Sequence, residues 1–307
     1  METSNKCMRD SCYYKKHTNI DNNGGIYCCK ACRDTNTHGP ACQHSLISED
    51  FINKISFVCN ITGKRFNLNN NEKGSESAIR FGFNSRFRAI CYVFCKLFYN
   101  ECKILNELPV NKNLKGIGMS DAGWANIFQN KFNYINTFYH TSPYLDIYNN
   151  DHIKNYNNLD FIISSDVFEH VNPFPSLQQA FNNLFKILKC GGTLIFSVPY
   201  TNGEHKEHFP NLYDYKIKKE NDKYILYNTT IDNKKETFNN LCFHGGPGNV
   251  LEMRVFSKMS IISFLEKAGF INITFYEITE DMKKYGIFWG SRTEQFSLII
   301  SAKKPAF

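Results

Sequence analysis

Two long apolar runs separated by one amphipathic helix constrain the fold of this chain more than any other feature. Residues Leu159 to Ser165 (LDFIISS) and Thr193 to Val198 (TLIFSV) are typical of strands buried on both faces of a parallel sheet. Between them, apolar residues from Leu177 to Leu188 recur at helical spacing, and Gly191-Gly192 is expected to cap that helix. The order strand, helix, glycine turn, strand predicts an α/β domain with a mostly parallel sheet.

The same alternation continues on both sides of this unit. Residues 139 to 158, between the second predicted strand and the run at Leu159, are too few for another helix plus strand. We therefore expect the first half of the domain to be abbreviated or rearranged. The remaining predicted elements are helices at Arg86–Cys102, Gly123–Lys131 and Lys258–Ala268 (capped by Gly269), strands at Lys115–Met119, Tyr134–Phe138, Ile271–Ile278 and Gln295–Lys303, and an exposed hairpin at Asn221–Glu236.

Composition limits the class of protein. With 307 residues, 42% of them hydrophobic, the chain can bury a large core. The net charge of +7 is spread without a block of like charges, which argues only weakly for a nucleic-acid partner. No apolar run approaches the roughly 20 residues that span a bilayer, so no membrane association is expected. The amino-terminal residues METSNKCMRDSCYYKK lack the apolar region of a secretory signal, so we expect a cytoplasmic protein with reduced thiols.

Six of the 12 cysteines lie before position 43, in a segment with too little apolar content for a core. Residues 1–48 are therefore predicted to be a Cys/His-rich module that holds a structural zinc ion. Free thiols in an arm without metal are the alternative. Residues 49–110 form a connecting segment with one amphipathic helix, and residues 111–307 form the larger domain. The preferred zinc ligands are Cys12, Cys29, Cys32 and Cys42, with Cys7, Cys28 or His38 as replacements. Cys59 is expected to be the remnant of a zinc ribbon or an ordinary core residue. Cys91, Cys95, Cys190 and Cys242 are expected to be inert thiols in apolar surroundings.

A strand that ends in D-x-x-E-H-V, a helix that leads to L-K-x-G-G, and a strand closed by Pro199 follow one another between Leu159 and Tyr200. This block resembles the middle of the class I S-adenosylmethionine-dependent methyltransferases. The resemblance implies a Rossmann-like, mostly parallel sheet with helices on both faces and S-adenosylmethionine (SAM) as cofactor. In such sheets ligands bind beyond the carboxyl ends of the strands, where Asp166, Glu169 and His170 are placed. The alternative is that this turn only caps and packs.

The cofactor loop of that family is an acidic residue followed by G-x-G-x-G. The most similar segment here is Gly116-Ile117-Gly118-Met119-Ser120-Asp121, so Gly116, Gly118 and Asp121 are predicted to bind the cofactor together with Asp166 and Glu169. An ordinary turn is the alternative for this glycine pair. Asp146, in YLDI, is the best substitute for the acid that binds the ribose in that family, and it is predicted to face either the ribose or the adenine.

A narrower resemblance, to a methyltransferase-like subgroup of which some members lie beside glycosyltransferases, implies a sugar acceptor. It rests on four segments: GFNSRFRAI (Gly82–Ile90), GMSD…NTFYHTSPYLDI (Gly118–Ile147), HFPNLYDY (His208–Tyr215) and FHGGPGNVLEMRVFS (Phe243–Ser257).

The polar, irregular residues 202–257 are predicted to be an insert that holds the substrate. A hydroxyl acceptor needs a general base, and a histidine of near-neutral pKa suits that task, which points to His208 or His244. Either histidine could also join Glu207 in holding a divalent ion. Surface or packing roles are the alternative for each histidine. The predicted catalytic residues are Asp166, His170, His208 and His244, and the predicted substrate-binding residues are His205, Glu207, Glu252 and Arg254.

Three hypotheses for function follow. The first is a SAM-dependent methyltransferase that transfers a methyl group to an oxygen of a glycan or small metabolite. The second is a catalytically inactive methyltransferase-like domain that serves as a binding or scaffold protein. The third, which the modest charge does not favour, is a nucleic-acid methyltransferase that uses the zinc module for binding. The oligomeric state is not predicted.

Overall fold

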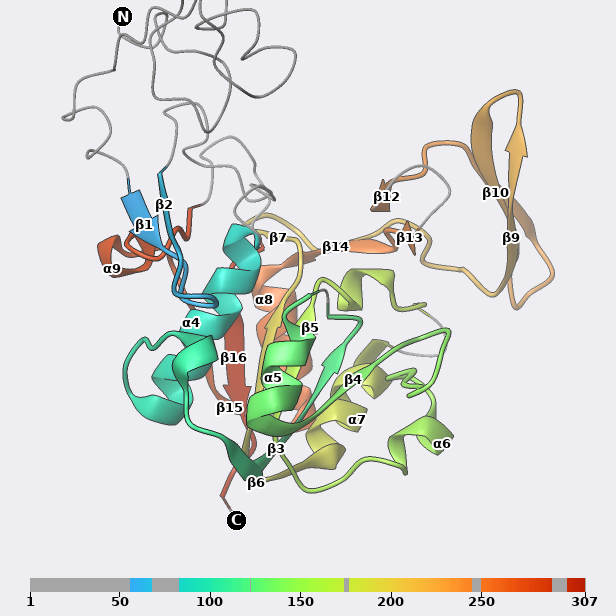
Figure 1. The fold of residues 1–307 in the computed structure, drawn as a ribbon. Helices are drawn as coiled ribbons and strands as arrows, with labels where there is room; N and C mark the ends of the chain where they lie inside the picture. The colour runs from blue at the N-terminus through green and yellow to red at the C-terminus, as the bar shows by residue number, and fades with distance from the viewer. Residues whose placement is uncertain are drawn as a thin grey trace, which may run out of the picture.

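The structure is a computed structural model that describes residues 56–67, 83–121, 123–173, 177–244, 250–288 and 297–306 (Figure 1). The predicted zinc module, residues 1–48, lies outside the described residues with all of its proposed ligands, so it stays a prediction. None of the described helices is long and apolar enough to cross a membrane.

A six-stranded sheet forms the centre of the domain, in the order β15-β16-β6-β5-β3-β4. The pairs β3–β4, β3–β5 and β5–β6 are parallel, whereas β16 pairs antiparallel with both β6 and β15. The predicted mostly parallel sheet is confirmed, and the strand order reverses between β3 and β5, as in doubly wound folds. The strands are β3 (Asn111–Met119), β4 (Phe132–Thr137), β5 (Leu159–Ser165), β6 (Leu188–Ser197), β15 (Ile271–Phe275) and β16 (Ile300–Lys303).

Helices cover both faces of this sheet, as predicted (Figure 1). On one face, α4 (Ser85–Tyr99) and α5 (Ala125–Lys131) bury aromatic rings against Phe161 of β5. On the other face, α7 (Leu177–Ile187) and α8 (Lys258–Ala268) form a second core with side chains of β5 and β6. The two cores together fix the sheet from both sides.

The first half of the domain is abbreviated, which confirms the prediction. Between β4 and β5 the chain forms only the short helix α6 (Asn150–Ile153) and an isolated bridge between Phe138 and Tyr144. Because no strand of the sheet is formed there, β4 is the edge strand.

Gly191-Gly192 does not cap α7, so that prediction was wrong. The helix ends at Ile187, and β6 begins at Leu188, before the glycines. Gly191, at φ 76°, lies in an irregularity of β6 where the register to β5 shifts between Leu188 and Thr193. Glycine is needed at that position because the bulged backbone enters the left-handed region.

The cysteine predictions are confirmed in part. The six described cysteines are free thiols, and Cys59, Cys91 and Cys95 are buried in the core. Cys190 and Cys242 are exposed instead of buried. Cys190 belongs to the irregular part of β6, and Cys242 lies in the insert, directly before Phe243.

The insert builds a small antiparallel sheet of its own, which projects from the main body in Figure 1. The predicted hairpin is present and is extended by one more strand. Asn221 and Asp222 make its first turn with φ angles of 48° and 59°, the left-handed conformation that tight hairpins need. A separate core of Phe209, Leu212, Leu226, Leu251 and Met253 stabilises the insert. Its strands are β9 (Asp214–Glu220), β10 (Lys223–Thr229) and β11 (Lys235–Phe238).

Short elements complete the described chain. The pairs β1–β2 and β12–β13 and the ladder β7-β14-β8 are small sheets that are separate from the central one. Their bounds are β1 (Ser56–Val58), β2 (Arg65–Asn67), β7 (Tyr200–Thr201), β8 (Lys206–Glu207), β12 (Phe243–His244), β13 (Val250–Leu251) and β14 (Arg254–Ser257), and the remaining helices are η4 (Leu105–Glu107), η5 (Phe168–His170) and α9 (Glu280–Lys283).

Candidate functional site

The turn after β5 lies at the carboxyl edge of the sheet, beside the point where the strand order reverses. Asp166 adopts φ 50° there, and its backbone N–H donates to the Ser197 carbonyl at 3.0 Å. Its carboxylate accepts a hydrogen bond from Ser197 Oγ at 2.6 Å and forms an ion pair with Arg86. Asp166 therefore lies at the predicted ligand edge, with a charge that is already paired.

Arg86 is a site residue that sequence reasoning did not single out. It stands in the first turn of α4, whose amino terminus is capped by the Asn84 side chain, and its Nε donates to Ser165 Oγ at 3.0 Å. Arg86 lies in the segment Gly82–Ile90, one of the four on which the narrower resemblance rests, and this segment could have pointed to it. Its ion pair with Asp166 joins residues that are 80 positions apart.

Glu169, His170 and His244 come together directly beside this turn. The His170 Nε2 atom is 3.5 Å and the His244 Nδ1 atom 3.7 Å from Glu169 Oε1. Glu169 is completely buried, and burial together with the nearby Asp166 raises the pKa of its carboxyl group well above the ordinary value. The second nitrogen of the His170 ring, Nδ1, lies 2.8 Å from the Leu251 carbonyl oxygen, and this contact fixes the orientation of the ring. Burial also lowers the pKa of His170.

Glu252 binds the two histidines that sequence reasoning proposed as general bases. Its Oε1 is 3.0 Å from His208 Nε2, and its Oε2 is 3.0 Å from His244 Nε2. Burial works to raise the pKa of Glu252, but the hydrogen bonds from His208 and His244 outweigh it and lower that pKa to about 2. The hydrogen bond to Glu252 in turn raises the pKa of His244. The insert thus places the imidazole rings of His208 and His244, both held by Glu252, at the carboxyl edge of the sheet.

Glu207 does not join His208 or His244, which corrects the idea that it shares an ion with them. It binds Arg254 Nε at 2.6 Å and His205 Nε2 at 3.1 Å. Arg254 is fully buried and donates from Nη1 to the Phe168 carbonyl at 2.7 Å, while His205 reaches Ser260 in the first turn of α8. These contacts connect the insert to the turn after β5 and to α8, and the substrate-binding role of His205, Glu207 and Arg254 stays a prediction.

Two of the predicted cofactor residues, Gly118 on β3 and Asp121 just after that strand, form a separate group with Tyr134. Asp121 is buried, accepts a hydrogen bond from Tyr134 on β4, and has one carboxylate oxygen, Oδ1, without a hydrogen-bond partner in the described chain. Burial raises its pKa to about 7 although the Tyr134 hydrogen bond works against the rise. A Cβ atom at Gly118 would lie 1.8 Å from both Asp121 Oδ2 and Tyr134 Oη, so these two side chains fill the space beside Gly118.

Gly116 and Asp146 are not part of either group. Gly116 lies inside β3, where a Cβ atom would come within 2.3 Å of the Phe161 ring, so the absence of a side chain allows close packing there. Asp146 accepts from the Tyr148 backbone N–H at 2.9 Å, and its own N–H lies 3.0 Å from His152 Nδ1. These contacts make Asp146 the anchor of a local turn between β4 and α6.

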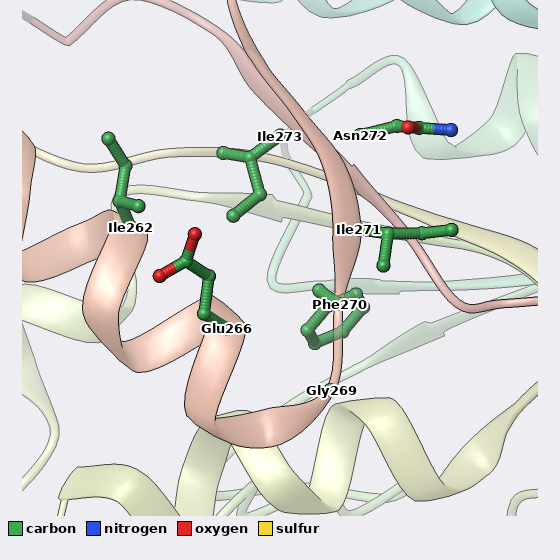
Figure 2. Close-up of a pocket in the computed structure, with 7 residues that line it drawn as sticks. All are labelled: Ile262, Glu266, Gly269, Phe270, Ile271, Asn272 and Ile273. Carbon is green, nitrogen blue, oxygen red and sulfur yellow. The ribbon is translucent and has the colours of Figure 1, made fainter.

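A pocket elsewhere on the molecule lies between the end of α8 and the beginning of β15. Ile262, Glu266, Gly269, Phe270, Ile271, Asn272 and Ile273 line it, and Figure 2 shows the Glu266 carboxylate extending from α8 toward Ile273. Because β15 runs parallel to β6, its beginning lies at the opposite edge of the sheet from Asp166. This pocket is therefore separate from the site at the carboxyl edge.

No protein-family model matches the sequence, and no curated protein matches it. Many solved structures are similar to it, among them SAM-dependent methyltransferases. The CurJ carbon methyltransferase is 12% identical, with a TM-score of 0.38 over 66% of this chain and 51% of that chain, so this chain spans about half its length. A SAM-dependent methyltransferase from Clostridium acetobutylicum is 14% identical, with a TM-score of 0.38 over 76% and 96%. The 1,6-didemethyltoxoflavin-N1-methyltransferase of Burkholderia thailandensis is 11% identical, with a TM-score of 0.36 over 71% and 78%.

Proposed function

We propose that this protein is a SAM-dependent methyltransferase that transfers a methyl group to a hydroxyl oxygen of a sugar or another small polar molecule. The observation that carries the proposal is the convergence, at the carboxyl edge of a doubly wound sheet, of the Asp166–His170 turn with the anchored histidines of the insert. Ligands of such sheets bind at this edge, at the point of strand-order reversal. The DVFEHV sequence of the turn is the segment on which the resemblance to class I methyltransferases rests.

The residues at this edge fit the cofactor chemically. SAM carries ribose hydroxyls and an ammonium group, which need acceptors. Asp121 Oδ1, a buried oxygen without a partner in the described chain, and the carboxylate of Asp166 supply them. Because Asp121 and Tyr134 fill the space beside Gly118, the cofactor would lie beyond that glycine, over the strand ends. Bound there, SAM would supply an electrophilic methyl group.

The chain's own contribution to the reaction is orientation and removal of a proton. Holding donor and acceptor in line can contribute roughly 7–11 kcal/mol of the barrier. His208 is the proposed general base: Glu252 fixes its Nε2, which leaves the lone pair of the neutral ring on Nδ1 to accept the hydroxyl proton. Glu252 thus acts on His208 as an orienting carboxylate.

Titration of the full chain with SAM by calorimetry tests this proposal. We expect binding, and we expect Asp166→Asn to weaken it by at least about tenfold, because an acceptor of the cofactor is lost. Asp160→Asn is the matched control. Asp160 lies at the amino end of the same strand and also forms an ion pair, with Lys189, and its substitution should leave SAM affinity unchanged. Equal effects of the two substitutions would place the cofactor elsewhere.

The inactive scaffold is the second candidate, and one observation favours it. Asp121 and Tyr134 occupy the space beside Gly118, against which a cofactor could otherwise lie. This candidate predicts no heat of binding at millimolar SAM, a result that would reject the methyltransferase proposal. The nucleic-acid alternative depends on residues 1–48, outside the described residues.

We also propose that residues 1–48 bind a structural zinc ion through Cys12, Cys29, Cys32 and Cys42. The close spacing of sulfur donors in a segment without core-forming residues supports this proposal.

A further inference from the structure

Among the described carboxylates, only Glu169 is buried with both oxygens lacking a hydrogen bond. It is 0% exposed, and neither of its carboxylate oxygens accepts a hydrogen bond from another described residue. A buried carboxylate that accepts no hydrogen bond is costly, so a compensating interaction is expected at this position. Arg86 and Arg254 act on it electrostatically, but each forms its ion pair with another carboxylate, Arg86 with Asp166 and Arg254 with Glu207.

Two imidazole nitrogens face this carboxylate. His170 Nδ1 lies 2.8 Å from the Leu251 carbonyl and His244 Nε2 3.0 Å from Glu252 Oε2. If those nitrogens carry the protons, the lone pairs are on His170 Nε2 and His244 Nδ1, the two atoms directed at Glu169 Oε1. Metal-binding histidines are commonly held in this way, with the outer nitrogen bonded to a carbonyl or a carboxylate.

The spacing of the three atoms suits one metal ion. One ligand atom from each of Glu169, His170 and His244 lies within 4.8 Å of the other two. Glu169 Oε1 is 3.5 Å from His170 Nε2 and 3.7 Å from His244 Nδ1. Bonds of about 2.0–2.1 Å separate tetrahedral ligands by roughly 3.3–3.4 Å and adjacent octahedral ligands by only about 2.8–3.0 Å. The separations therefore favour tetrahedral coordination.

We propose that Glu169, His170 and His244 form a binding site for a divalent metal ion of the zinc type. Glu169 Oε1, His170 Nε2 and His244 Nδ1 are the ligands, Glu252 and the Leu251 carbonyl orient the two rings, and the fourth position is open. Three protein ligands with an open position are the pattern of catalytic zinc sites. The His244 side chain is 34% exposed, so an ion and a small ligand can reach the site from solvent.

A competing set in the same region consists of Cys242, His244 and Glu252. It is less suited to an ion, because both oxygens of Glu252 already accept from histidines.

A hydroxyl on a bound divalent ion loses its proton more readily, so the ion would prepare an acceptor for methylation. That role rests on the proposed function, whereas the metal site does not.

The test is a titration of the metal-free full chain with Zn²⁺ against a chromophoric chelator, together with Co²⁺ absorption spectra. We expect Glu169→Gln and His170→Gln each to bind one ion fewer than the wild type. We expect Glu252→Gln to lower the affinity for that ion by about 10–100-fold. Glu204→Gln, which removes an exposed carboxylate from the same insert, is the matched control and should bind as the wild type does. The Co²⁺ bands that disappear in Glu169→Gln should lack thiolate charge transfer, which separates this ion from one held by the amino-terminal cysteines.

Two outcomes would overturn the proposal. One is unchanged metal stoichiometry in both ligand variants, with folding verified by near-ultraviolet circular dichroism. The other is loss of the ion in Cys242→Ser but not in Glu169→Gln, which would place it on the competing set. If the protein did not bind SAM, the proposed metal site would not be affected, since no step of this titration uses the cofactor.

Discussion

At the scale of single residues, the pair of Asp121 and Tyr134 makes stability depend on pH. Burial raises the pKa of Asp121 from 3.8 to about 7, so the folded state holds this proton more tightly than the unfolded state does. The resulting stabilisation is fully present below the unfolded pKa and is lost as the pH rises through about 7. We expect it to fall by about 2–3 kcal/mol between pH 5 and pH 8.

Urea unfolding of the wild type and of Asp121→Asn at about pH 5 and pH 8 measures how much Asp121 changes the free energy of unfolding. The asparagine cannot titrate and still accepts from Tyr134, so the free energy of unfolding of the variant should change less with pH by this amount. Parallel pH profiles for the two proteins would show that Asp121 does not titrate in this range.

At the scale of elements, α4 matters because it carries Arg86 two positions after its cap. Asn84 Oδ1 accepts from the Phe87 N–H at 2.9 Å and satisfies one of the free donors at the helix start. Asn84→Ala should therefore cost about 1 kcal/mol of unfolding free energy. Asn126→Ala, at an exposed position of α5, is the control and should stay within about 0.5 kcal/mol. Equal losses in thermal denaturation would contradict a capping role.

Elements with strong local signals could be predicted from the sequence. The range of β5 and of α8 with its Gly269 cap agree with the structure residue for residue, since an unbroken apolar run and a capped periodic helix are local patterns. The start of β6 could not be predicted from the sequence, because only its pairing with β5 shows that the strand begins before Gly191. The site was foreseen as a set of residue types. Its partners were not, because contacts such as His170 with Leu251 join residues 81 positions apart.

At the scale of the whole molecule, the central sheet and the insert have separate cores. The sheet is covered on both faces, whereas β9 is almost fully exposed and the insert relies on five buried side chains. We expect backbone amides of β3 and β5 to exchange with deuterium only on global unfolding, and those of β9–β11 to exchange faster through local opening. Hydrogen-exchange mass spectrometry measures this difference, and equal protection of β5 and β10 would show one cooperative unit.

The position of β16 between β6 and β15 also matters while the protein is being made. Synthesis proceeds from the amino terminus, so β6 has no partner on that side until residues 300–303 have emerged from the ribosome. A nascent chain therefore carries an open strand edge after most of its sheet has formed, and such edges recruit other chains. This edge is where aggregation of newly made protein would begin, and where a chaperone would have to act.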